Sequence, residues 1–331
     1  RPRPGRGAAG FLTPPKHNAR VTHARHDPRK GRTMLPHHNR YPYSPITDRP
    51  DFTWPGGRRL AVYLGMNLEC FAFGSGLGAA LAPGGPEPDI LNYAWRDYGN
   101  RVGAPRMRAL FDRLDLPVTV LANSALYREA PGLIESFRAR GDEIAGHGRT
   151  NAERQGTLDR REEARLIAEA TKTLTEAEKR PPKGWLGPWI SQSHATPDLL
   201  AAAGYEYLLD WCHDEQPVWM RTEAGPILSV PYPQELNDIP QIVARKREGS
   251  EFADMIIDAF DVMLAESPHR PLVLGIALHG YLMGHPHRLK HLERALRHIL
   301  MHGGDRIWFT RAGDISDHYR HLYPPPTDTN A

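Results

Sequence analysis

The sequence predicts an α/β fold in the form of a single (β/α) barrel of seven to eight mainly parallel strands. From Arg59 onward, β-type and α-type segments alternate, a pattern typical of parallel strands joined by covering helices. The chain has 331 residues, of which 40% are apolar, so it is long enough to bury one large core. No internal repeat and no Pro/Ser-rich linker divides this part of the chain, which favours one barrel over two domains.

Eight segments have the apolar character of strands. They are Leu60–Met66, Val118–Ala122, Glu143–Gly146, Gly184–Leu186, Tyr205–Asp210, Ile227–Val230, Leu272–Leu278 and Arg306–Thr310. Helical patterns occupy six segments between them, namely Arg101–Leu114, Ala125–Arg140, Asp159–Lys179, Pro197–Ala203, Glu251–Glu266 and His287–Met301. Asp159 opens an acidic helix start, and Gly204 and Gly303 fall where helix-terminating glycines belong.

Residues 1–40 differ in composition from the rest of the chain. They carry ten Lys or Arg against one Asp and are rich in Pro, Gly and Arg, which predicts a disordered basic extension. The whole chain has a net charge of +3, so the barrel expected over residues 41–331 is mildly acidic. An acidic body argues against nucleic acid as a partner, and we assign the extension no function.

The composition also argues against a membrane protein and against a disulfide framework. No stretch reaches the roughly 18 apolar residues that span a bilayer. Cys70 and Cys212 are the two cysteines of the chain, too few for a disulfide-based scaffold. This cysteine usage favours the reducing cytoplasm.

Polar side chains recur at the C-terminal ends of the predicted strands. The first strand leads into Asn67 and Glu69, the third into His147, the fifth into Asp210 and the seventh into His279. The loop after the sixth strand adds Glu235, Asn237 and Asp238. Because the loops at these ends of a barrel converge on one face, the pattern predicts an active-site rim.

Three of these residues are candidates for the chemistry itself. Glu69 follows an apolar run, and partial desolvation raises a carboxyl pKa towards the range of a general base; the alternative is a Glu that points outward at a loop start. His279 ends the most strand-like run and is a candidate proton donor, or else a satisfied core histidine. His147 lies between two glycines in a polar loop, which either faces a ligand or is a solvated turn.

Other residues are candidates for orientation and substrate binding. The Asp210 carboxylate is a candidate to orient an imidazole, as the third member of a triad does. Four tryptophans are candidates for an apolar wall against a flat ligand, namely Trp185, Trp189, Trp211 and Trp219, although tryptophans are more often ordinary core. Arg96 and Tyr98, in a loop before a helix, are candidate donors to a bound carbonyl; the alternative is an internal Arg–Asp pair.

The sequence offers few clear metal ligands. His285, His287 and His291 lie in a basic amphipathic stretch, which predicts a solvated helix face and not a metal site. Four residues after His147 stands Asn151, and an amide oxygen is a poor zinc ligand compared with imidazole or carboxylate.

Taken in order, these motifs resemble the polysaccharide deacetylase (NodB-homology) superfamily from about residue 41 to the C-terminus. The resemblance rests on the segments Asn39–Pro45, Trp54–Val62 leading into Asn67–Glu69, His147–Asn151, Gly184–Trp189, Val230–Asp238 and Leu278–His279. It is closest to an atypical branch that includes the metal-independent type of allantoinase and cyclic-imide hydrolases. The superfamily fold is a distorted (β/α) barrel, and the related branch commonly forms symmetric oligomers, so the resemblance implies both here.

The resemblance also implies where the chain departs from the sugar deacetylases. In those enzymes the first strand ends in an Asp pair, of which one acts as base and the next binds metal. Here Asn67 is similar to the base position and Glu69 to the ligand position. The family's His-x-x-x-His metal pair becomes His147 and Asn151. The implied cofactor is therefore none, or one weakly held divalent metal such as zinc on Glu69 and His147.

The acid half of the machinery is intact by the same comparison. His279 matches the strand-terminal histidine that acts as general acid, and Asp210 matches the Asp that supports a catalytic histidine. We therefore expect a hydrolase of non-peptide C–N bonds in a small cyclic amide, ureide or imide. In it Glu69 and His147 activate and position water, and His279 protonates the leaving nitrogen. The residues expected around the substrate are Asn67, Arg96, Tyr98, Arg149, Asn151, Trp185, Trp211, Glu235, Asn237 and Asp238.

Three alternatives stay open. The first is metal-dependent deacetylation of an N-acetylated sugar, which requires another ligand in place of Asn151. The second is a non-catalytic barrel that binds a small ligand without turnover. The third is a nucleic-acid-associated protein that uses the basic extension, and it predicts binding that weakens steeply with salt.

Overall fold

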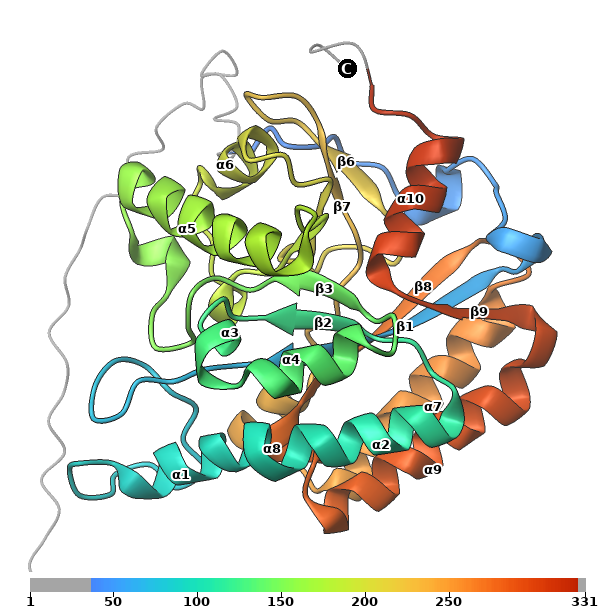
Figure 1. The fold of residues 1–331 in the computed structure, drawn as a ribbon. Coiled ribbons are helices and arrows are strands. Elements are labelled where there is room, and N and C mark those ends of the chain that lie inside the picture. Colours follow the sequence, from blue (N-terminus) through green and yellow to red (C-terminus); the bar gives the residue numbers. More distant parts are fainter. Residues whose placement is uncertain (1–36, 327–331) are drawn as a thin grey trace, which may run out of the picture. The chain divides into compact units, whose positions relative to one another are not determined.

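The structure is a computed structural model and describes residues 37–326 (Figure 1). The predicted basic extension up to residue 36 lies outside the described residues. Arg40, the last residue assigned to that extension, forms an ion pair with Asp198 at 2.6 Å, so the packed chain begins near this position. Within the described residues, no helix combines the length and apolar character needed to cross a membrane.

Nine strands of the described chain form one sheet in the order β6-β7-β5-β4-β3-β2-β1-β8, with β9 also paired to β1. Their bounds are β1 Leu60–Leu68, β2 Thr119–Ala122, β3 Glu143–Gly146, β4 Gly184–Trp185, β5 Tyr207–Leu208, β6 Val218–Met220, β7 Ile227–Ser229, β8 Leu272–His279 and β9 Ile307–Thr310. All neighbours are parallel except β6 and β7. This confirms the predicted α/β barrel of mainly parallel strands.

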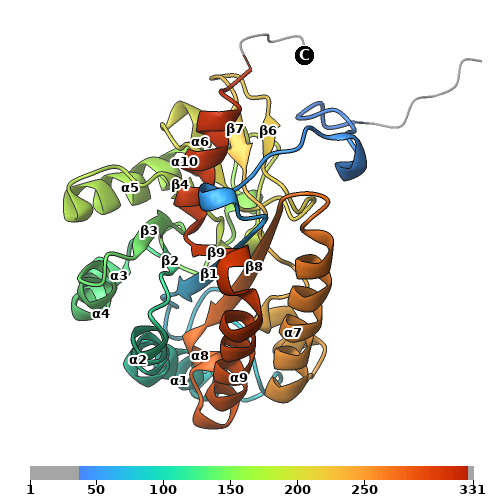
Figure 2. The same cartoon turned by 90° about the vertical axis from the view of Figure 1, so that its right-hand side faces the viewer.

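Two details of the sheet differ from the sequence prediction. The three-residue β6 was not predicted, because a short antiparallel strand after a polar loop carries little periodic signal. The edge strands β6 and β8 are not paired with each other, so the sheet curls into a half-barrel with an open seam. Figure 2 shows β8 beside α7 and α9, while β6 and β7 lie apart from it.

Helices cover the sheet at bounds close to those predicted, with three additions. The helices are α1 Ile90–Tyr98, α2 Ala104–Leu114, α3 Leu126–Glu129, α4 Pro131–Arg138, α5 Arg160–Glu178, α6 Thr196–Ala202, α7 Gly249–Glu266, α8 Gly280–Met283, α9 Pro286–Gly303 and α10 Ala312–Leu322. The sequence reading missed α1, α8 and α10. One predicted helix is split into α3 and α4 because Pro131 begins a new helix. Asp159 caps α5 with a capping box, as its acidic start indicated.

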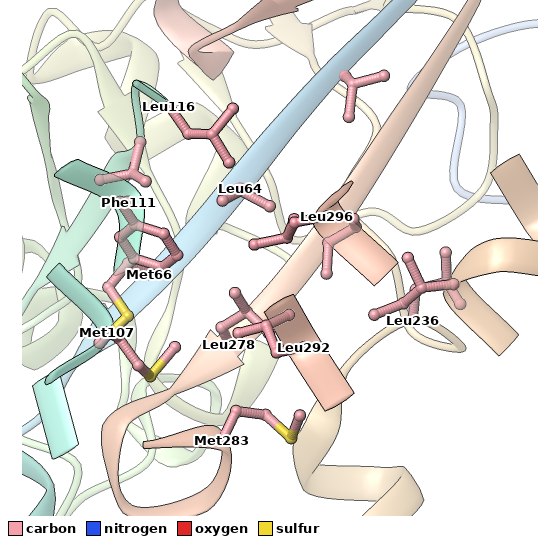
Figure 3. Packing of buried hydrophobic residues seen from close by; sticks show 14 of the residues in the cluster. Leu64, Met66, Met107, Phe111, Leu116, Leu236, Leu278, Met283, Leu292 and Leu296 are labelled. Carbon is pink, nitrogen blue, oxygen red and sulfur yellow. The ribbon is translucent and has the colours of Figure 1, made fainter. Parts of the chain in front are cut away.

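The alternation of residues along the strands separates an outer face from the inside of the barrel. The even-numbered residues of β1, from Leu60 to Leu68, pack outward in one buried cluster with side chains of α2 and α9 (Figure 3). The odd-numbered residues face the barrel interior, where Ala61 and Tyr63 pack with Leu121 and Ala145. Because side chains of a strand alternate between faces, the odd-numbered residues at the strand ends point inward too.

Candidate active site

Glu69 lies at the centre of a buried group of polar side chains beyond the C-terminal end of β1. Its side chain is 4% exposed, and its Oε1 lies 3.5 Å from Nε2 of both His147 and His279. The Asn151 amide donates a hydrogen bond to the same Oε1. The Tyr281 hydroxyl donates to the other oxygen, Oε2, at 2.6 Å. The structure therefore brings together Glu69, His147, Asn151 and His279, as the sequence predicted.

His279 is held by a carboxylate that the sequence did not assign to it. Its Nδ1 lies 2.6 Å from Oδ1 of Asp238, and its backbone N–H donates to Oδ2 at 2.8 Å. Burial alone would lower the pKa of His279, but the charges of Asp238 and Glu69 outweigh burial and raise it to about 10. At neutral pH the ring is therefore protonated and directs an N–H towards Glu69.

The protonation of Glu69 complements that of His279. Burial by itself would raise the pKa of Glu69, as the sequence analysis expected, but the charge of His279 outweighs burial and lowers it. At neutral pH the site thus contains an ionised carboxylate, which accepts a proton, beside an imidazolium, which donates one. These are the two states that a general base and a general acid need.

The prediction that Asp210 supports His279 is wrong. Oδ1 of Asp210 accepts a hydrogen bond from the backbone N–H of Gly187 at 2.7 Å. Side chains alternate between the two faces here: Leu208 packs in a cluster outside the barrel, and Leu209 packs inside it. Asp210 follows Leu208 by two residues and therefore lies on the outer face. Burial raises the pKa of Asp210 to about 7. A position at a strand end therefore does not reveal which face the side chain takes.

His147 presents a lone pair to Glu69. Its Nδ1 lies 2.7 Å from the carbonyl oxygen of Leu186, and because a carbonyl only accepts, Nδ1 carries the proton in a neutral ring. Nε2 is then an acceptor; it is buried and has no hydrogen-bond partner among the described residues. It lies 3.5 Å from Oε1 of Glu69, so two hydrogen-bond acceptors face each other inside this buried group.

A chain of amides fixes the orientation of Asn151. The backbone N–H of Cys70 donates to Oδ1 of Asn123 at 2.8 Å, so the Asn123 amide nitrogen faces the other way. That nitrogen donates to the backbone oxygen of His147 and to Oδ1 of Asn151, the latter at 2.9 Å. Asn151 must therefore turn its N–H₂ towards Glu69. The sequence analysis did not single out Asn123. This residue follows the end of β2, two positions after the inward-facing Leu121, and so its side chain also faces the barrel interior.

Asn67 lies next to this group but faces the barrel interior. It is paired in register with His279 across β1 and β8. Its amide nitrogen donates to the Tyr232 hydroxyl at 3.1 Å and to the carbonyl oxygen of Leu278 at 3.3 Å. Asn67 thus connects the end of β1, next to Glu69, with Tyr232 in the barrel interior.

Arg96 and Tyr98 are both engaged within the protein. Nη1 of Arg96 donates to the carbonyl oxygen of Ala79 at 2.6 Å, in a buried position. The Tyr98 ring stacks on His285 at 4.2 Å between centroids. The Arg–Asp pair considered as an alternative for this segment is formed by its neighbour Asp97, which pairs with Arg101. In the structure described, neither Arg96 nor Tyr98 contacts Glu69.

Two further charged candidates are taken up by ion pairs. Arg149 pairs with Glu153 and Glu169, each at 2.8 Å. Glu235 is 65% exposed and pairs with Arg245 at 2.8 Å. Arg149 and Glu235 therefore have partners of their own, and the structure does not bring them to Glu69.

Trp185, Trp211 and Asn237 also have roles in the framework. Trp185 is fully buried outside the barrel and its indole N–H donates to Gln155 at 3.2 Å. The indole of Trp211 donates to Gln192 at 2.6 Å. Asn237 forms an isolated parallel bridge with Ala277, which brings the neighbouring Asp238 alongside β8. This bridge explains why Asp238, and not Asp210, reaches His279.

The comparisons with known proteins agree with this fold. No family model matches the chain. A solved structure of Puue allantoinase superposes with a TM-score of 0.78 at 28% identity, covering 86% of this chain and 99% of that chain. A probable polysaccharide deacetylase from Pseudomonas aeruginosa PAO1 superposes with a TM-score of 0.75 at 29% identity, covering 86% and 100%. A putative polysaccharide deacetylase from Schizosaccharomyces pombe is 24% identical over 289 residues, 81% of this chain and 88% of its own length.

In sequence and fold the chain resembles the polysaccharide deacetylase (NodB-homology) superfamily. It resembles allantoinase within that superfamily. Deacetylase and allantoinase homologues indicate a hydrolase that acts on non-peptide C–N bonds.

The residues present do not fit the metal site of the superfamily's sugar deacetylases. Zinc sites in enzymes use three protein ligands, and the described residues contain no group of three or more His, Cys, Asp or Glu side chains arranged to hold a metal ion. At the third ligand position Asn151 directs N–H groups at Glu69, where a cation would need a lone pair. His279 is protonated and bound to Asp238. Only the carboxylate of Glu69 and Nε2 of His147 are left in this group with lone pairs that could bind a metal ion.

Proposed function

We propose that the chain hydrolyses a C–N bond in a small cyclic amide, ureide or imide, with Glu69 as general base and His279 as general acid. The observation that carries the proposal is the environment of one carboxylate oxygen. Oε1 of Glu69 lies 3.5 Å from the acceptor Nε2 of His147 and 3.5 Å from the donor Nε2 of His279. Base, water-orienting group and acid therefore meet at one point.

Each side chain has one part in the reaction. A water molecule between Glu69 and His147 gives one proton to Oε1 of Glu69 while its oxygen forms a bond to the substrate carbonyl carbon. In the tetrahedral intermediate, Nε2–H of His279 protonates the ring nitrogen. The C–N bond then breaks and its electron pair stays on nitrogen. The proton on Glu69 returns to His279 over the 3.5 Å that separate them, which restores both groups.

The surroundings favour a flat, carbonyl-bearing substrate. The indole N–H of Trp189 donates to the backbone oxygen of Asn151 at 3.0 Å, which fixes the ring beside the His147 loop. The Arg154 guanidinium lies over that ring, 5.5 Å from its centroid. An aromatic face with a cation above it suits a planar amide, and the likeness to Puue allantoinase supports the same substrate class.

A hydrolysis panel with two carboxylate variants tests the proposal. The panel contains allantoin, hydantoin, succinimide, dihydrouracil and N-acetylglucosamine oligomers. We expect turnover of at least one cyclic compound, and a loss of about 10³-fold or more in kcat for Glu69→Gln. The matched control is Asp210→Asn, which makes the same change at a buried carboxyl outside this group and should retain activity. Near-normal turnover by Glu69→Gln would show that Glu69 is not the general base. Turnover of N-acetyl sugars alone would show that the substrate is an acetylated sugar and not a cyclic amide.

A further inference from the structure

We propose that Tyr281 is a positioning residue for Glu69, which fixes the carboxylate so that Oε1 and not Oε2 faces the two histidines. This inference rests on the proposed function of Glu69 as base. Tyr281 was not among the predicted site residues, because it lies two residues beyond His279 in α8, a helix that was not predicted.

The two carboxylate oxygens of Glu69 have different hydrogen-bond partners. The Tyr281 hydroxyl donates to Oε2 at 2.6 Å, whereas the shortest distances from Glu69 to both histidines are those of Oε1. Oε1 receives the Asn151 amide and lies 3.5 Å from both imidazoles. A carboxylate held at only one oxygen can rotate about its terminal torsion, which is broad and nearly two-fold. Tyr281 removes that freedom.

Close glycine contacts bring Tyr281 to this place. A five-residue π-helical turn, Gly99–Gly103, joins α1 to α2 and packs against α8. A Cβ on Gly99 would lie 2.8 Å from the backbone nitrogen of Tyr281, and one on Gly103 would overlap the carbonyl of Gly280. Because these glycines have no side chain, α8 approaches the turn closely enough for Tyr281 to reach Glu69.

The same turn holds Glu69 from its backbone. The Asn100 side chain donates to the carbonyl oxygen of Glu69 at 2.7 Å. The Tyr281 ring is 4% exposed and lies edge-on to Trp95 and Phe71, with centroid distances of 5.0 and 5.9 Å. Base and phenol are thus fixed to one rigid segment. Burial and the charge of Glu69 keep the pKa of Tyr281 well above its usual value, so the phenol stays a donor.

The first test compares Tyr281→Phe with Tyr63→Phe. Each variant loses one hydroxyl from a buried ring; that of Tyr63 donates to the carbonyl oxygen of Pro231 at 2.6 Å, inside the barrel. We expect Tyr281→Phe to lower kcat about 10- to 100-fold with KM changed less than about threefold, because a misoriented base slows chemistry more than binding. Tyr63→Phe should keep both parameters. Equal losses in the two variants, or wild-type kcat in Tyr281→Phe, would overturn the proposal.

The second test needs no substrate. The infrared band of the Glu69 carboxylate is isolated as the difference between the wild-type protein and Glu69→Gln, each labelled with ¹³C-glutamate. We expect this band to shift in Tyr281→Phe, since Oε2 loses its donor, and to stay in place in Tyr63→Phe. An unchanged band in Tyr281→Phe contradicts the inference. If the wild-type protein hydrolyses nothing in the panel but the band shifts, the proposed function fails while the positioning of Glu69 by Tyr281 stands.

Discussion

Asp238 accepts two hydrogen bonds from one residue, His279, through Nδ1 at 2.6 Å and through the backbone N–H at 2.8 Å. A carboxylate bound in this two-point manner fixes both the ring and the strand end that carries it. It also leaves Nε2 of the protonated ring directed at Glu69. The acid in the site is therefore set by a residue from the loop between β7 and α7.

Asp238→Asn should weaken this acid and move its titration. Because the charge of Asp238 helps to raise the pKa of His279 to about 10, its removal lowers that pKa. The alkaline limb of the pH–kcat profile should then move to lower pH, and kcat at neutral pH should fall about 10- to 100-fold. The measurement is kcat from pH 6 to 11 for both proteins, with Asp210→Asn as the control. An alkaline limb at the same pH in Asp238→Asn would show that His279 does not act as the acid.

Chelation should leave activity unchanged. The catalytic groups assigned above are side chains, and the described residues do not supply three ligands for a metal ion. We expect the protein to keep its kcat within about twofold after exhaustive treatment with a chelator, and to contain less than a stoichiometric amount of transition metal. Activity that disappears with chelator and returns with Zn²⁺ would contradict this expectation and favour the metal-dependent alternative.

Asn151→Asp should inactivate the site without enlarging it. The substitution replaces an N–H donor with a carboxylate of the same size, directly against Oε1 of Glu69. Repulsion between two buried carboxylates raises the pKa of one of them, so a proton is shared and Glu69 is no longer a free base. We expect kcat to fall at least about 100-fold at pH 7. Turnover within twofold of the wild-type protein would show that the amide has no part in setting the state of Glu69.

His279 should also make stability depend on pH. Its pKa is about 10 in the folded protein against 6.5 for the ordinary side chain, so folding favours the protonated ring. This contribution is complete below pH 6.5 and is lost as the pH rises to 10. We expect the urea midpoint of the wild-type protein to fall across this window, and His279→Gln to lose less over the same range. Parallel curves for the two proteins would contradict the shifted pKa.

The alternation of side chains along the strands could have been used further to predict which residues face the barrel interior. The apolar run of β1 fixes which residues face outward, and counting in twos places Asn67 and Glu69 inside the barrel. The same alternation along β2, β3 and β8 places Asn123, His147 and His279 inside the barrel. It fails at Asp210, because β5 is two residues long and its parity is set only by what packs around it.

From periodicity and residue type alone one can predict the alternating α/β pattern and the place of Glu69, His147 and His279 at strand ends. Those features depend on periodicity and on residue type, which are local properties of the chain. The hydrogen-bond partners of these residues depend instead on contacts between distant segments. Asp238 arrives through a bridge to β8, and Tyr281 through glycine contacts between segments about 180 residues apart in the chain. Such contacts depend on how closely two backbones approach, which no local pattern encodes.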